Sequence, residues 1–169
     1  MTILGLFVLR ELGLTAAGYS LVLAAAGVGG FLGALCAPWV GRRLREGNAI
    51  ILGRLLCTTA WLAMSATPEL GATSTLWFVC SAQLLYGFAM GLEDPNEMGY
   101  WQAVTPREML GRVNATRRSA NRSTAVVGAL LGGLVAAVLG YRGTLIVVTT
   151  VFLIASLVAA LSPLRGTRA

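Results

Sequence analysis

Three carboxylates lie close together at the end of an apolar stretch. Glu93, Asp94 and Glu97 follow Leu92, and Pro95 lies among them. Negative charges at the C-terminal end of a helix oppose the helix dipole, so they require positive charge nearby. In a buried setting, carboxylates of this kind relay protons or pair with other charged groups.

The next segment of the chain contains the positive charge that these acids require. Four arginines lie there: Arg107, Arg112, Arg117 and Arg118. Either these arginines simply neutralise the acids at a membrane interface, or three of them (Arg112, Arg117 and Arg118) form a cytoplasmic gate or a proton-coupling site with the acids. An exposed ion pair adds at most about 1 kcal/mol, so stability does not distinguish the two interpretations.

The sequence contains no group of residues typical of an enzyme, a metal site or a cofactor site. Histidine is absent, and Cys36, Cys57 and Cys80 lie in separate apolar stretches without metal-ligand spacing. The basic residues are all arginines, and they lie in or beside short segments without interleaved aromatic residues. We therefore predict no enzyme activity, no metal, no cofactor and no nucleic-acid partner.

Five apolar stretches are long enough to cross a bilayer as helices, which takes roughly 17–25 residues. They are residues 16–40, 49–66, 76–92, 120–139 and 144–161. A short connection at 140–143 joins the last two, and Pro163 stops the last one. Because 56% of the residues are hydrophobic, the chain is predicted to be an all-α bundle of membrane-spanning helices.

The arginines alternate between the segments that connect these stretches. They gather at 42–54, at 107–122 and in the tail, whereas the intervening segments contain only Arg10 and Arg142. Loops rich in arginine stay in the cytoplasm. We therefore predict a multi-pass protein of the cell (plasma) membrane with a cytoplasmic C-terminus. Arg54, one turn into the second stretch, is expected to extend toward the interface.

Residues 1–15 do not form a complete span. At about 1.5 Å of rise per residue, residues 1–9 cover less than half of a bilayer core, and Arg10 follows on the outer side. The simplest interpretation is the outer end of a helix whose beginning is missing. The chain is therefore expected to be part of something larger.

Two polar residues, Gln83 and Tyr86, lie near the middle of the third stretch. A side-chain amide at this depth must find a hydrogen-bond partner or a water-filled cavity. A hydrogen bond between helices and the lining of a substrate cavity both remain open.

Small residues recur every four positions in three of the stretches. The glycines among them are Gly29 and Gly33, Gly87 and Gly91, and Gly128 and Gly132. Faces of small residues let helix backbones approach closely in lipid, where no hydrophobic effect drives helices together. They serve either packing within this bundle or a moving interface between two bundles.

Several segments carry motifs of a known family. The first motif is Gln-Ala-Val-Thr-Pro at 102–106 followed by Gly-Arg-Val-Asn-Ala at 111–115. The second and third motifs are residues 29–43 and residues 161–165. In this order they resemble the tenth-to-eleventh-helix connection, the eighth helix and the end of the twelfth helix of the major facilitator superfamily, especially its enterobactin-exporter-like branch. Two features of the chain depart from the pattern of the family. Relatives often have an aspartate that pairs with arginines in the loop after an even-numbered helix, but residues 29–43 contain no acidic residue. Arg122 lies at the start of the fourth stretch, where relatives usually have small residues.

The resemblance implies helices seven to twelve of a twelve-helix secondary active transporter. The implied function is proton-linked efflux of small molecules such as drugs or siderophores, here in a fragment that lacks the N-terminal half. The implied partners are the lipid bilayer, the missing half or another copy, and a small-molecule substrate. Gly29, Gly33, Gly128 and Gly132 are expected at the half-to-half interface. The alternative is a non-transporting truncated or accessory membrane subunit that associates through these glycine-rich faces.

Overall fold

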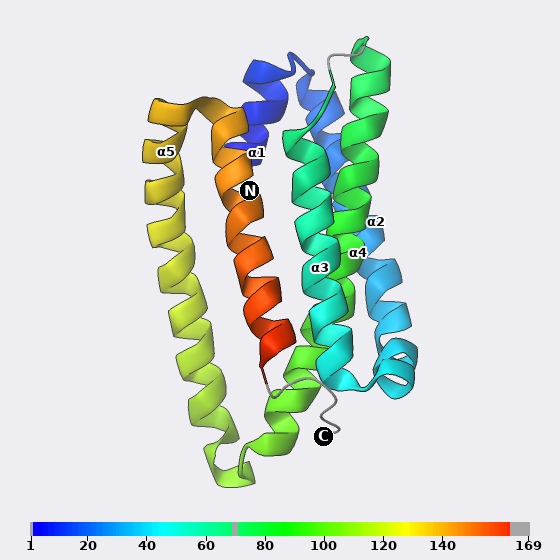
Figure 1. Ribbon diagram of the computed structural model, residues 1–169, viewed down its shortest axis with the longest axis vertical. Helices are drawn as coiled ribbons and strands as arrows, with labels where there is room; N and C mark the ends of the chain where they lie inside the picture. The colour runs from blue at the N-terminus through cyan, green and yellow to red at the C-terminus, as the bar shows by residue number, and fades with distance from the viewer. Residues whose placement is uncertain (1, 69–70, 163–169) are drawn as a thin grey trace.

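The computed structural model describes residues 2–68 and 71–162, and they form an all-helical bundle (Figure 1). The long helices are α2 (Ala16–Leu44), α3 (Glu46–Ser65), α4 (Ala72–Val104) and α5 (Leu110–Leu161), and the short ones are α1 (Thr2–Leu6), the π-helix η1 (Phe7–Glu11) and the 3-10 helix η2 (Arg107–Met109). Four helices are long and apolar enough to cross a membrane. The predicted all-α membrane bundle is confirmed.

Successive long segments run in opposite directions (Figure 1). Helix α5 folds back at Gly140, whose backbone has φ 71° and ψ 176°, so it contributes two antiparallel segments. A positive φ of this kind is readily adopted only by glycine. The α2–α3 and α4–α5 connections, with most of the described arginines, come to one end of the bundle, which we call the arginine-rich end. Pro163, Arg165 and Arg168 lie outside the described residues.

Helix α4 is longer than the predicted stretch at 76–92, because it continues through Pro95 to Val104. The acidic cluster therefore lies inside a helix and not at its C-terminal end. A proline inside a helix removes one backbone hydrogen bond. Packing of the following turn offsets this loss, since Asn96 is 7% exposed and its amide donates hydrogen bonds to the carbonyls of Ala37 in α2 (3.3 Å) and Leu92 (2.8 Å).

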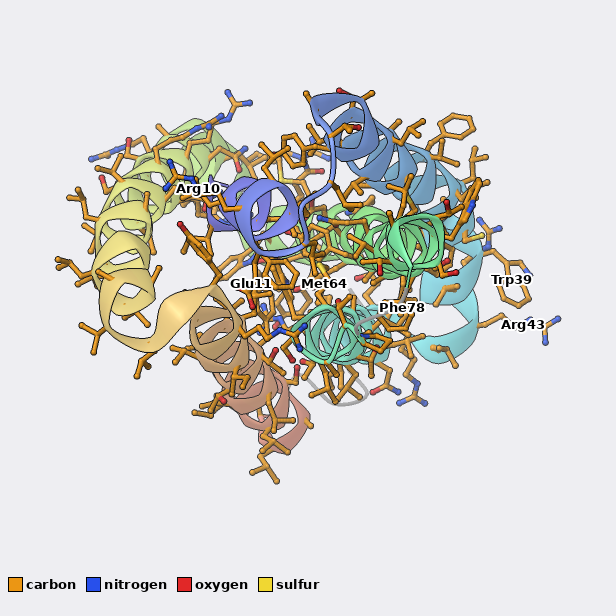
Figure 2. The ribbon with its side chains drawn as sticks, turned by 90° about the horizontal axis from the view of Figure 1, so that it is seen from above. Arg10, Glu11, Trp39, Arg43, Met64 and Phe78 are labelled. Atoms are coloured by element: carbon orange, nitrogen blue, oxygen red, sulfur yellow. The ribbon has the colours of Figure 1, made fainter. Side chains whose placement is uncertain are left out.

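The short N-terminal helix contributes to the main hydrophobic core. Leu4, Phe7 and Val8 are at most 1% exposed, and they pack in one cluster with residues such as Trp61 and Met64 of α3. Seen along the bundle, this helix lies between α2 and the first half of α5 (Figure 2). The segment that was predicted to be only the end of a helix is thus among the most buried parts of the bundle.

Helices α2 and α4 pack against each other at four glycines. A Cβ atom on Gly29 or Gly33 would meet the carbonyl oxygen of Leu84 or Phe88 in α4, and a Cβ atom on Gly87 or Gly91 would meet the carbonyl oxygen of Ala26 or Gly30 in α2. The small-residue spacing therefore serves packing inside this bundle. The prediction that Gly29 and Gly33 face a second half is corrected here, because α4 already covers them.

The two halves of α5 differ in their surroundings. The second half contacts α3, where the hydroxyls of Ser156 and Thr58 form a buried hydrogen bond of 3.2 Å. The first half stands apart from the other long helices (Figure 1). A Cβ atom on Gly128 would meet nothing within 4 Å, and one on Gly132 would meet only the side chain of Ile3. The predicted contact face of this helix is open in the described part of the chain.

Candidate functional site

The centre of the candidate site is an ion pair between α3 and α4. The Nε atom of Arg54 donates to Oε1 of Glu93 over 2.8 Å, and the side chains are 29% and 9% exposed. Gly53 makes this approach possible, because a Cβ atom there would lie 2.7 Å from the Cβ atom of Glu93. A buried carboxylate of this kind is stable only with a compensating partner.

Sequence reasoning missed Arg54 as that partner. Its position one turn inside an apolar stretch suggested extension toward the interface, whereas the structure turns it toward α4. A usable signal was present: an arginine beside a glycine inside a span can approach a neighbouring helix closely enough to pair with a buried acid.

A second cluster joins α4 to the start of α5. Arg117 donates through Nη2 to Oε1 of Glu97 over 2.8 Å, and its guanidinium lies 5.1 Å from the ring centroid of Trp101. The indole of Trp101 donates to the same carboxylate oxygen over 3.3 Å. These groups are more exposed than Glu93, so the pair resembles an interfacial contact more than a buried one.

The acids of the predicted cluster all lie in α4, but their side chains contact two different helices. Glu93 turns to α3 and Glu97 to α5, while Asp94 is exposed on α4. Of the four arginines predicted to lie near these acids, Arg117 pairs with Glu97, and Arg107, Arg112 and Arg118 are exposed.

At the opposite end of the bundle, one ion pair links segments far apart in the sequence. The Nε atom of Arg142 in α5 donates to Oε1 of Glu11 in η1 over 3.0 Å. Glu11 and its neighbour Arg10 lie beside the short N-terminal helix (Figure 2). The sequence placed Arg10 and Arg142 on this side but did not predict the pair, because no spacing rule connects residues so distant in the chain.

The bundle interior contains polar groups without protein partners in the described residues. Gln83 is 0% exposed, and neither its amide oxygen nor its amide nitrogen has a hydrogen-bond partner. The indole nitrogen of Trp61 in α3 is in the same condition. Tyr86 packs edge-on against Trp61 with ring centroids 5.4 Å apart, and Phe152 of α5 stacks on Trp61 at 6.4 Å.

Gln83 and Tyr86 are three residues apart in α4, so they share a helical face. That face is turned toward the aromatic side chains of α3 and α5. A fully buried amide that makes no hydrogen bond is unfavourable by several kcal/mol. The arrangement therefore suits recognition of a molecule that brings both apolar surface and a few hydrogen-bonding groups.

No candidate metal site appears in the described residues, because no group of three or more Cys, Asp or Glu side chains could hold an ion there.

Comparison with known proteins supplies one match. The family described as Major Facilitator Superfamily matches residues 1–168, almost the whole chain. No curated protein and no solved structure matches.

Proposed function

This chain belongs to the major facilitator superfamily, a family of membrane transporters, and we propose that it takes part in secondary active transport of a small molecule across the plasma membrane. In this proposal it acts as the C-terminal half of a proton-linked exporter of the enterobactin-exporter-like branch, with drugs or siderophores as substrates and with its C-terminus in the cytoplasm. The observation that carries the proposal is the buried Arg54–Glu93 pair inside a multi-pass membrane bundle.

The charge of Glu93 links proton binding to helix contact. When ionised, Glu93 holds Arg54 and ties α4 to α3. A proton on Glu93 removes its charge and weakens the tie, so that α4 and α3 can separate at the arginine-rich end. Glu97 with Arg117 ties α4 to α5 in the same region, and Asp94, Arg112 and Arg118 supply further exposed charge. Protonation of Glu93 and separation of α4 from α3 are thereby coupled.

The substrate contact proposed here is the polar face of α4. Gln83 can donate and accept hydrogen bonds, and the ring of Tyr86 beside Trp61 offers an aromatic surface. In a transporter that alternates between two states, groups near the middle of the membrane become accessible in turn. A substrate that satisfies the buried amide gains hydrogen bonds that the protein itself does not supply.

The partner proposed for the bundle is a second six-helix half, or another copy of the chain, packed on the first half of α5. This segment has an open face of small residues that includes Gly128 and Gly132. Small residues are typical of close helix contacts in membranes.

A susceptibility assay in an efflux-deficient host tests the proposal. The chain is expressed alone and with a separately encoded N-terminal half of a related permease, each also with Glu93→Gln. Protection against drugs or siderophore toxicity is expected only when both halves are present, and Glu93→Gln is expected to abolish it. The matched control Glu108→Gln removes an exposed acid of η2 and is expected to leave protection intact.

Two outcomes would contradict the proposal. Protection by the chain alone that Glu93→Gln does not affect would exclude the coupling role. Correct membrane insertion without protection in any combination would favour a subunit that associates through its helix faces and does not transport.

A further inference from the structure

Two buried hydroxyl groups connect α3 to the second half of α5. The Oγ1 atom of Thr58 and the Oγ atom of Ser156 lie 3.2 Å apart, and neither side chain is more than 7% exposed. Each hydroxyl also lies close to a backbone carbonyl one turn earlier in its own helix. The carbonyl oxygen of Arg54 is 2.9 Å from Thr58, and that of Phe152 is 2.7 Å from Ser156. Three hydrogen-bonding contacts therefore meet at this pair.

The two hydroxyls have one hydrogen each, so they cannot make all three hydrogen bonds at once. In the first arrangement, Thr58 donates to the carbonyl of Arg54 and Ser156 donates to Thr58. In the second arrangement, Thr58 donates to Ser156 and Ser156 donates to the carbonyl of Phe152. Both arrangements keep the hydrogen bond between the helices, and only the hydroxyl hydrogens rotate between them. The pair therefore has two states that differ in which carbonyl is hydrogen-bonded.

The two arrangements act on different helices. A hydroxyl that donates to the carbonyl four residues earlier tends to bend its own helix. The first arrangement thus favours a bend of α3 in the turn of Arg54, and the second favours a bend of α5 in the turn of Phe152. A change at one end of this hydrogen-bonded chain is felt at the other end.

Both turns belong to the candidate site. The side chain of Arg54 pairs with Glu93 of α4. The ring of Phe152 stacks on Trp61 with centroids 6.4 Å apart, and Trp61 packs edge-on against Tyr86 of α4. Arg54 and Trp61 are three and four residues from Thr58 or closer to it by one turn of α3, so all three share one helical face. The hydroxyl pair thus connects the ion pair to the aromatic cluster.

The second half of α5 has no charge of its own with which to respond to Glu93, because residues 144–161 contain no charged side chain. The charged and titratable side chains that interact with Glu93 come from the other two helices: Arg54 and Cys57 in α3, and Asp94 and Glu97 in α4. The hydrogen bond of Ser156 to α3 is therefore a contact through which a change at Glu93 can reach α5.

We propose that Thr58 and Ser156 form a hydrogen-bond switch that transmits the charge state of Glu93 to the aromatic cluster. This inference rests on the proposed function, in which Glu93 binds the proton. Loss of the charge on Glu93 releases Arg54, the turn of α3 that contains Arg54 relaxes, and the hydroxyl pair changes its arrangement. The hydrogen bond to the carbonyl of Phe152 changes with it, and the Phe152 ring moves against Trp61. Coupling through packed groups requires such an element with two discrete arrangements.

Fluorescence of Trp61 in the purified full chain tests this switch. The other tryptophans, Trp39, Trp77 and Trp101, are exposed, so they are replaced by phenylalanine and Trp61 remains as the single tryptophan. In this background Glu93→Gln fixes position 93 in an uncharged form of similar shape. We expect Glu93→Gln to shift the emission maximum of Trp61, because the Phe152 ring moves on its face.

Two variants that each remove one hydroxyl are expected to abolish this shift. In Ser156→Ala, Thr58 keeps the carbonyl of Arg54, and in Thr58→Val, Ser156 keeps the carbonyl of Phe152. The conservative variant Thr58→Ser retains a hydroxyl and should keep the shift.

Thr149→Val is the matched control for the loss of a buried hydroxyl from α5. Thr149 is 8% exposed and donates to the carbonyl of Leu145 in its own helix, so Thr149→Val should keep the shift. Circular dichroism checks that every variant is folded, and if one of the two hydroxyl deletions does not fold, the other decides.

Two results would overturn the inference. One is an emission maximum of Trp61 that does not respond to Glu93→Gln. The other is an undiminished shift in Ser156→Ala or Thr58→Val, because the signal would then pass directly along α4 from Glu93 to Tyr86. Neither result depends on transport. A failure of the proposed function, which the susceptibility assay detects, is therefore distinguishable from a failure of this switch.

Discussion

Replacing Gly29 with alanine tests the packing of α2 against α4 most directly. The added Cβ atom would overlap the carbonyl oxygen of Leu84. That oxygen belongs to a helix backbone, so it cannot rotate away as a side chain can. Helices α2 and α4 must therefore separate by roughly 1 Å to restore an ordinary carbon–oxygen contact.

The magnitude follows from the matched variant Gly27→Ala in the same helix. A Cβ atom on Gly27 would meet nothing within 4 Å. Alanine is a better helix former than glycine by about 1 kcal/mol, and this gain applies to both variants. The difference between them therefore isolates the contact with α4. Overpacking a close contact is unfavourable by about 1–3 kcal/mol, so Gly29→Ala should be less stable than Gly27→Ala by that amount.

The assay is reversible unfolding of the two variants in mixed micelles, with helix content followed by circular dichroism. A second pair repeats the test from the other side: Gly91 in α4 would meet the carbonyl of Gly30, whereas Gly99 in the same helix meets nothing. The double variant Gly29→Ala with Gly91→Ala should lose less than the sum of the single losses, because one separation relieves both overlaps. Equal stabilities of Gly29→Ala and Gly27→Ala would refute the backbone-to-backbone packing.

Three further predictions concern single contacts. Glu93→Gln should destabilise the bundle by about 1–3 kcal/mol, less than for a fully buried pair because Arg54 is 29% exposed, and adding Arg54→Gln should restore part of the loss in the same unfolding assay. Ser156→Ala should lower the free energy of unfolding by less than about 1 kcal/mol. The single hydrogen of the Thr58 hydroxyl can be donated to the carbonyl of Arg54 in its own helix, so Thr58 keeps a partner when Ser156 is removed. A larger loss would contradict this reasoning. Gly140→Ala should lower the free energy of unfolding by more than about 1 kcal/mol, because the backbone of Gly140 has a positive φ. Disulfide crosslinking between the two halves of α5 across the turn should then become less efficient.

Local patterns in the sequence predicted the helices well. Each of the predicted apolar stretches is helical over nearly its whole length in the structure, and the glycine-bounded connection at 140–143 predicted the reversal that the structure has at Gly140. The prediction that the acidic cluster lies at the C-terminal end of a helix was wrong, because the end of an apolar stretch need not be the end of a helix. Helix α4 continues past Leu92, since Asn96 is held against α2.

The partners of the charged residues could not be derived from spacing. Glu93 lies within hydrogen-bonding distance of Arg54, thirty-nine positions away, and Glu11 of Arg142, one hundred and thirty-one positions away. Such pairs depend on how helices rotate about their axes, and that rotation follows from packing at Gly53 and at the α2–α4 contact. A small-residue pattern reveals that a face packs closely, but not which helix covers it.

The same distinction explains why the glycines of α2 and of α5 have different surroundings despite the same spacing. At Gly29 and Gly33 the partner helix is present, and the added Cβ atoms would overlap its backbone. A Cβ atom on Gly128 would meet nothing within 4 Å. The first half of α5 is held by Arg117 near its start, by the side chain of Ile3 at Gly132 and by the turn at Gly140. Such a helix is fixed at both ends and has an open face of small residues, so it can receive a second helix without rearrangement of the core. This arrangement supports α5, and not α2, as the helix that contacts another bundle.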